Sequence, residues 1–168
     1  MNYPVILVDI ITDVINSMNI PGKSINFIPG RNIQIISGLI SIDNNPVPTP
    51  KYPLIAMVMP IKETRSPIGY YATVNIGRIV IATLTNLTDS IQTRYLEGGT
   101  YKSTLYPCYY EFLNKLAMSH NIINNDPGAF KHTKMDNPGT QPIGEGLIDA
   151  VDIIEILNLE LTLKQIVN

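Results

Sequence analysis

Charged side chains are scarce in this sequence. Asp, Glu, Lys and Arg make up 15% of its 168 residues, against roughly 25% in an average soluble domain. A surface with few charges is easier to press against other protein, because burying a charge costs several kcal/mol, whereas amides and hydroxyls need only hydrogen-bond partners. The composition therefore favours a protein that works by assembly.

Cysteine is almost absent, since Cys108 is the only one. One thiol can form neither an internal disulfide nor a cysteine-based zinc site, and this fits a reducing compartment. A nucleophilic thiol would need a neighbouring base and an electropositive setting. Because Cys108 follows Pro107 in a segment rich in tyrosine, we expect it to be a small core residue.

Basic runs and long apolar runs are also missing. The twelve Lys and Arg are scattered and the formal net charge is -2, whereas sustained contact with duplex phosphates needs a basic stripe. Neutral contact with DNA passing through a channel stays open. No run reaches the roughly 18 apolar residues of a membrane span. The N-terminal residues also lack the basic flank and cleavage site of a signal peptide, so we expect neither membrane insertion nor export.

A chain of this length suits one domain, residues 1–168. Polar residues at helical spacing predict a helix over 4–18. An apolar stripe predicts a longer amphipathic helix over 104–119, with Pro107 in its first turn. The 121–146 segment, rich in Asn, Pro and Gly, predicts a long irregular loop.

Strands are expected in four other segments. Ile-rich residues predict one over 32–43, and others are predicted over 54–60, over 71–85 and from about 150 to 163. In the third of these strands Val74, Ile76, Val80 and Ala82 should share one face. Arg78 interrupts that face, and Gly77 beside it predicts a bulge or bend that lets the arginine leave the core. The fold class is α+β, with an antiparallel or mixed sheet packed against an N-terminal helix and one long amphipathic helix.

Three groups of side chains carry possible chemistry. His120 follows the long helix and is expected to cap it. His132 and Asp136 are four residues apart with Asp126 nearby, but a metal site needs three or four convergent ligands. Asp149, Asp152 and Glu155, preceded by Glu145, could act as acid and base if burial raised one pKa. A solvated or partner-facing acidic edge is the preferred interpretation of this last group.

Two further patterns are interpreted as structural. The segment Glu97-Gly98-Gly99-Thr100 has two glycines but no phosphate-loop lysine, so we expect a flexible turn. The nine tyrosines could stack nucleic-acid bases, yet no basic run is interleaved with them. Packing in the core and at interfaces is the preferred role.

The order of the expected elements resembles that of a known group of proteins. An N-terminal helix, a sheet, a long amphipathic helix and a returning strand resemble the fold of tail-terminator and neck ring proteins of tailed bacteriophages, and most of all the ring (head-to-tail connector) proteins of crAss-like phages. The resemblance covers most of the chain. It involves the segments Tyr52-Pro53-Leu54-Ile55, 71–85, Thr93-Arg94-Tyr95, 101–113 and 148–156.

This resemblance implies a structural virion protein without catalytic residues, cofactor or metal. The chain would form a homo-oligomeric ring in the phage neck or tail, between the portal and the tail. Its partners would be copies of itself and adjacent portal, neck or tail rings, with genomic DNA only passing through the lumen. The resemblance also places Arg94 and Tyr95 at or near an interface, with an exposed helix-start residue as the alternative for Arg94. The protein would be made in the host cytoplasm and located in the virion.

The Ile-rich segment supports assembly independently. As a strand it would have Ile33, Ile35 and Leu39 on one face and Ile36, Ile40 and Ile42 on the other. A small two-layer domain covers only one face of a sheet, so the second needs a helix, a neighbour or a ring partner. Ile36 and Ile40 are therefore interface candidates.

Two other classes of function stay open. One is a small enzyme that uses the acidic edge or the His132 region. The other is a single-stranded nucleic-acid binding module built on the tyrosines.

Overall fold

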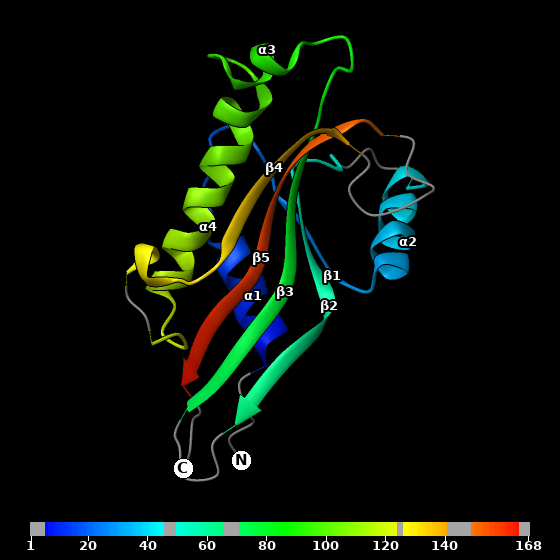
Figure 1. Cartoon of the computed structure of the whole chain (residues 1–168). Coiled ribbons are helices and arrows are strands. Elements are labelled where there is room, and N and C mark those ends of the chain that lie inside the picture. The colour runs from blue at the N-terminus through cyan, green and yellow to red at the C-terminus, as the bar shows by residue number, and fades with distance from the viewer. Residues whose placement is uncertain (1–5, 46–49, 66–70, 124–125, 141–148, 165–168) are drawn as a thin grey trace.

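The structure is a computed structural model that describes residues 6–45, 50–65, 71–123, 126–140 and 149–164 (Figure 1). Its helices are α1 (Leu7–Asn16), α2 (Asn32–Asp43), α3 (Ile91–Tyr95) and α4 (Tyr106–Met118). Its strands are β1 (Asn26–Gly30), β2 (Leu54–Arg65), β3 (Tyr71–Leu84), β4 (Thr133–Thr140) and β5 (Val151–Lys164). A π-helical turn, Tyr101–Leu105, leads into α4, and a 3-10 turn, Pro127–Ala129, precedes β4.

The strands form one mixed sheet in the order β1-β2-β3-β5-β4. β1 runs parallel to β2, and the other neighbouring pairs are antiparallel. Helices α1 and α4 pack on one face of this sheet, whereas α2 packs on the other (Figure 1). The α+β class predicted from the sequence is confirmed.

Both helices predicted from clear apolar spacing are present. Ile11 of α1 and Phe112 of α4 are fully buried in one core against the sheet. Pro107 lies in the first turn of α4, directly after the π-helical turn Tyr101–Leu105. Among the described helices, none is long and apolar enough to cross a membrane.

The Ile-rich segment 32–43 is helix α2, so the prediction of a strand there is wrong. Ile35 and Leu39 are four residues apart, and both are fully buried in the smaller core between α2 and the sheet. The backbone N–H of Arg31 donates to Gln34 Oε1 at 2.8 Å, which helps to start the helix. The strand preference of isoleucine depends on the surface it meets, and here burial of the i, i+4 pair outweighs it.

The phase of alternation in β3 changes at Gly77. Val74, Ile76, Ile79 and Ile81 belong to the core with α1 and α4, whereas Val80 and Ala82 belong to the core with α2. The expectation that Val74, Ile76, Val80 and Ala82 share one face is therefore wrong. The irregularity expected at Gly77 is present, because the pairing of β2 with β3 shifts between Val58 and Ile61, opposite that glycine.

The 121–146 segment is not one long loop, because residues 133–140 form strand β4. β4 pairs with β5 through Lys134 opposite Ile156 and Asp136 opposite Ile154. Its sequence, TKMDNPGT, has few apolar residues, and the alternation that predicts strands is therefore weak in this edge strand. Residues 141–148 lie outside the described residues. The short strand β1 was also missed, since Pro29 and Gly30 lie within it.

Candidate assembly interface

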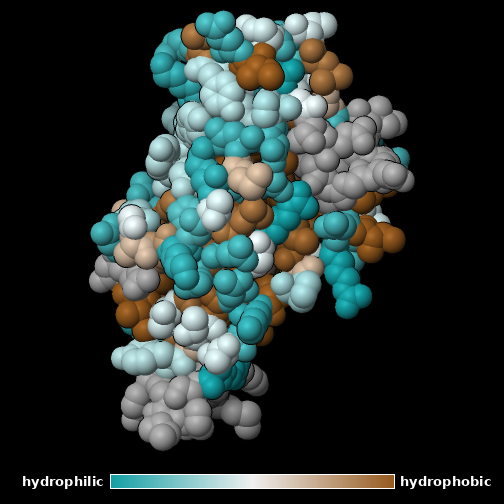
Figure 2. Space-filling view, in the orientation of Figure 1, coloured by the Kyte–Doolittle hydropathy of each residue, from teal (hydrophilic) through white to brown (hydrophobic). Residues whose placement is uncertain are grey.

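Three exposed apolar side chains lie on and beside helix α3 at one end of the molecule. Leu87 is 66% exposed, Ile91 64% and Leu96 55%. Figure 2 shows hydrophobic residues at the end of the molecule where Figure 1 places α3. We call these three residues the apolar tip. Apolar groups gathered on a surface in this way are typical of contact sites with other molecules.

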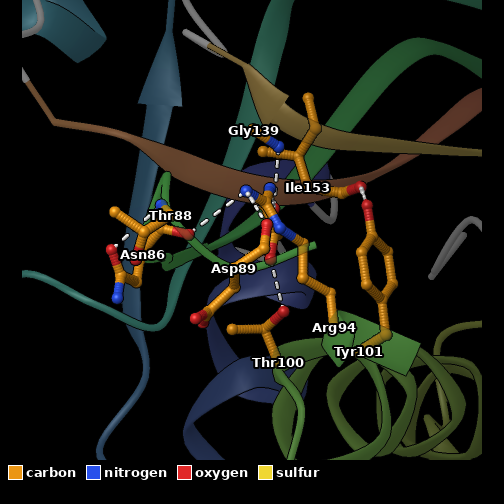
Figure 3. Close-up of polar contacts among 9 residues, drawn as sticks. Asn86, Thr88, Asp89, Arg94, Thr100, Tyr101, Gly139 and Ile153 are labelled. Carbon is orange, nitrogen blue, oxygen red and sulfur yellow. Dashed lines mark hydrogen bonds and ion pairs between the residues drawn. The ribbon is translucent and has the colours of Figure 1, made fainter. Parts of the chain in front are cut away.

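The apolar tip is fastened to the sheet by Arg94 of α3. Its Nη1 lies 2.5 Å from Asp152 Oδ1 on β5, and both side chains are buried. Its Nη2 donates to the backbone oxygens of Asn86 and Asp89, at 3.2 and 3.3 Å. One guanidinium therefore holds the 86–89 turn and α3 against the first residues of β5 (Figure 3).

Asp152 connects two further segments to the same point. Its Oδ1 accepts a hydrogen bond from Gly139 N at the end of β4, at 2.7 Å, and its Oδ2 accepts one from the Thr100 hydroxyl (Figure 3). A buried carboxylate needs such donors, because it has lost its water. Arg94 Nε is buried and has no hydrogen-bond partner among the described residues. The arrangement gives the apolar tip a defined position on the sheet.

Gly139 and the 97–100 turn allow this close packing. Gly139 has φ +64, and a Cβ there would lie 2.8 Å from Arg94 Nη1. The turn predicted over 97–100 is confirmed, with Gly98 at φ +81 and a hydrogen bond from Gly99 N to Leu96 O. A Cβ on Gly99 would overlap the Arg94 carbonyl. Glycine is therefore required on two sides of Arg94.

The structure changes the interpretation of Arg94 and Tyr95. Arg94 is only 5% exposed, so the alternative of an exposed helix-start residue is wrong, and its side chain fixes the tip without being presented on it. Tyr95 is half-buried, and its ring stacks on Tyr101 with centroids 4.2 Å apart. The interface that the resemblance implies at or near Arg94 and Tyr95 stays a prediction. Both residues lie in α3, next to Ile91 and Leu96 of the exposed tip.

The expectation of a solvated or partner-facing acidic edge at the start of β5 is wrong for Asp152 and Glu155, which are buried. Asp152 is fully buried, and Glu155 is nearly so, with its Oε1 2.5 Å from Arg78 Nε. Asp149 Oδ2 lies 2.5 Å from Lys51 Nζ. These cations are far away in the sequence, 77 positions in the case of Arg78, which is why local composition did not reveal them. Glu145 lies outside the described residues.

Lys51 and the tyrosines beneath the tip have raised pKa values. Burial alone would lower the pKa of Lys51, but hydrogen bonds to Asp149 and Asp43 and the charges of those carboxylates raise it. Burial, together with a hydrogen bond to Asp136, raises the pKa of Tyr106 to about 12. The pKa of Tyr101 is raised by burial and by Tyr95. All these contacts favour the protonated forms.

Hydrogen bonds fix the tyrosines of the α3–α4 region. Tyr95 and Tyr106 both donate to Asp136 Oδ2, at 3.3 and 2.9 Å. The Tyr101 hydroxyl donates to the backbone oxygen of Ile153 at 3.1 Å. The core packing expected of the tyrosines is therefore confirmed for this group, and Tyr101 is fully buried.

The histidines and Cys108 have separate surroundings. His132 Nε2 lies 2.6 Å from the Tyr109 hydroxyl and its Nδ1 lies 2.8 Å from Phe130 O. His120 is exposed just beyond the end of α4. Among the described residues, no three His, Cys, Asp or Glu side chains gather as metal ligands. Cys108 is fully buried, as expected of a core residue, and burial raises its pKa to about 11.

A second apolar surface lies on the outer side of α2. Ile33 is 71% exposed and Ile40 is 46% exposed, whereas Ile36 between them is half-buried and packs against the smaller core. We call these three residues the α2 stripe. Their spacing puts Ile33 and Ile40 on the side of the helix opposite Ile35 and Leu39. The segment is thus apolar on two sides, as the sequence indicated, although it is a helix.

The fold defines an α+β protein with a five-stranded mixed sheet and helices on both faces. Comparisons with protein-family models, with curated proteins and with solved structures found no match to this chain. The two exposed apolar surfaces and the buried Arg94–Asp152 pair are accordingly interpreted from their own geometry.

Proposed function

We propose that this chain is a structural subunit of a homo-oligomeric ring in the neck or tail of a tailed bacteriophage. The ring joins the portal to the tail and leaves a channel for the genome. The observation that carries this proposal is the presence of two separate exposed apolar surfaces, the apolar tip and the α2 stripe, on one small domain.

Two different surfaces on one chain allow head-to-tail contact between copies. A single self-complementary patch gives a closed dimer, whereas a heterologous pair of patches continues from copy to copy and closes when the rotation between copies permits. Low charge supports the same conclusion, since few ions must lose water when the copies associate. The likeness of the sequence to neck and tail-terminator rings supports the location in the virion.

Buried ion pairs support a structural role for the acidic residues. Asp152 and Glu155 each bond to an arginine, and Asp149 bonds to Lys51. The hypotheses of an enzyme and of a single-stranded nucleic-acid binding module stay predictions, and no contact in the described residues favours either of them over the ring.

Electron microscopy and mass analysis test the proposal. Virions of the phage that encodes this chain should contain it in a fixed copy number, and neck or tail assemblies isolated from them should show it as a ring. Purified protein should form the same ring alone or on an adjacent ring protein. Absence of the chain from purified virions would overturn the proposal.

A further inference from the structure

We propose that the α2 stripe of one copy seats against the apolar tip of the next copy. This inference rests on the proposed ring and names the two surfaces that build it. The occupant of the tip is therefore a second copy of this chain, through Ile33 and Ile40 of its helix α2.

The tip borders a hollow of about 350 Å³ beside α3. Its wall is mostly polar residues and glycines, such as Asp89, Thr93 and Gly98, with Leu96 as its aliphatic side chain. Leu96 thus contributes both to the exposed apolar surface and to the wall of the hollow. An isoleucine that entered it would cover apolar surface on both partners.

The α2 stripe has the geometry of a helix that inserts side chains into a partner. Ile33 and Ile40 are seven residues apart, which is about 10 Å along a helix axis. Two aliphatic anchors at this spacing are a common way for a helix to dock on an apolar surface. Their opposite neighbours, Ile35 and Leu39, hold the helix on the sheet, so α2 offers the stripe from a fixed position.

The charges beside the two surfaces are complementary. Arg31 is exposed two positions before Ile33, and the first turn of α2 has no acidic residue. Asp89 and Glu97 line the hollow at the tip, and Glu97 pairs with Lys102, so Asp89 supplies the acidic charge there. In Figure 3 the Asp89 side chain points away from the Arg94 guanidinium, so its carboxylate is available to a neighbour.

The same charges oppose one symmetric alternative. Contact of tip with tip would bring Asp89 of one copy towards Asp89 of another. Like charges brought together at an interface disfavour that pairing. Stripe against tip is the pairing that joins opposite charges and also continues around a ring.

Cysteine cross-linking tests the pairing directly, because the full chain has one cysteine and that residue is buried. Ile91→Cys and Ile33→Cys place thiols on the tip and the stripe, at exposed positions. Mixed under mild oxidation at high protein concentration, the two single variants should give a cross-linked heterodimer. One chain that carries both substitutions should give a ladder of higher oligomers. The unsubstituted chain is the control and should remain uncross-linked.

Other cross-linking patterns would overturn the inference. Efficient dimers of Ile91→Cys alone would show contact of tip with tip, and dimers of Ile33→Cys alone would show contact of stripe with stripe. A mixed sample with no more cross-linking than the control would also contradict the inference. In each case electron microscopy of the unsubstituted protein and of virions is scored separately. A ring without the stripe–tip cross-link removes this inference and leaves the proposed function standing, whereas absence from virions removes the function.

Charge reversal gives a second readout that a folding defect would not reproduce. Arg31→Glu and Asp89→Arg change exposed side chains, and each alone should weaken association by about fivefold. The double variant restores opposite charges and should recover most of the lost association, as measured by sedimentation. Additive losses in the double variant would contradict the pairing.

Discussion

Arg94 on α3 and Asp152 on β5 are separated by 58 positions in the sequence, and their Nη1 and Oδ1 atoms lie 2.5 Å apart with both side chains buried. The pair connects the surface that we assign to assembly with the second strand of the sheet from the β4 edge. A buried pair of this kind adds little net stability over apolar packing, but removal of one partner leaves an unmatched charge. It therefore acts mainly to specify where the tip sits.

Loss of either charge should destabilise the protein strongly. We expect Arg94→Ala and Asp152→Ala each to lower the free energy of unfolding by about 3–5 kcal/mol, because each leaves a buried ion without its partner. The double variant Arg94→Leu with Asp152→Leu should lose less than the sum of the single changes. Denaturant unfolding measures all three.

A surface ion pair provides the matched control for this prediction. Lys102 and Glu97 pair with both side chains well exposed, so Lys102→Ala should change the midpoint of unfolding little. An Arg94→Ala variant as stable as Lys102→Ala would show that the buried pair does not hold the tip.

Alanine in place of Gly139 should lower the stability of the protein through backbone strain and through contact with Arg94. The same change at Gly22 measures the backbone strain alone. Gly139 and Gly22 both have positive φ, +64 and +70, but a Cβ at Gly22 would meet nothing within 4 Å, whereas one at Gly139 would press on Arg94 Nη1. Gly22→Ala should cost about 1 kcal/mol of backbone strain, and Gly139→Ala about 2–4 kcal/mol. Thermal or denaturant unfolding compares them, and equal costs would argue against the contact with Arg94.

Neighbouring positions on α2 distinguish its buried side from its exposed side. Leu39 is fully buried and Ile40 is substantially exposed. Leu39→Ala should lower the free energy of unfolding by about 2–4 kcal/mol through the cavity it leaves, and Ile40→Ala by less than about 1 kcal/mol. A strand through 32–43 would instead make the effects of Ile36→Ala and Ile40→Ala alike. Unfolding of the purified variants gives the comparison.

Stability should fall at alkaline pH through the tyrosines beneath the tip. Burial and the Asp136 hydrogen bond raise the pKa of Tyr106 from 10.0 to about 12, so folding favours its protonated form. This contribution is complete below pH 10 and is lost as the pH rises through 12. Tyr106→Phe should therefore be less stable at neutral pH but lose less stability between pH 10 and 12. Unfolding free energy measured against pH checks this, with Tyr110→Phe on the exposed side of α4 as control.

Elements with a strong local pattern could be predicted from the sequence. The apolar spacing around Phe112 predicted α4, and the alternation from 158 to 163 predicted the last half of β5. The prediction of a strand over 32–43 was wrong because isoleucine is common in strands, while the pair Ile35 and Leu39 fits a helix equally well. The edge strand β4 was not predicted, because Lys134, Asp136 and Asn137 give it little apolar alternation. Such elements depend on neighbours that local patterns do not contain.

One of the two candidate surfaces could be predicted from the sequence and the other could not. Ile40 could be proposed as an interface residue because the segment has more isoleucines than one side can bury. The apolar tip was approached only through Arg94 and Tyr95, which lie beneath it. The signal that could have found it is the run of well-spaced apolar residues Leu87, Ile91 and Leu96 among Asn, Thr, Asp and Ser.

The α+β class, the burial of Cys108 and the low charge follow from composition and from spacing within one or two turns of chain. The contacts between carboxylates and cations, and the side of α2 that faces outward, follow instead from how distant segments pack. Pairings such as Arg94 with Asp152 depend on the order of strands in the sheet and on the phase shift at Gly77. Those features join distant segments, and no local pattern of residues specifies them.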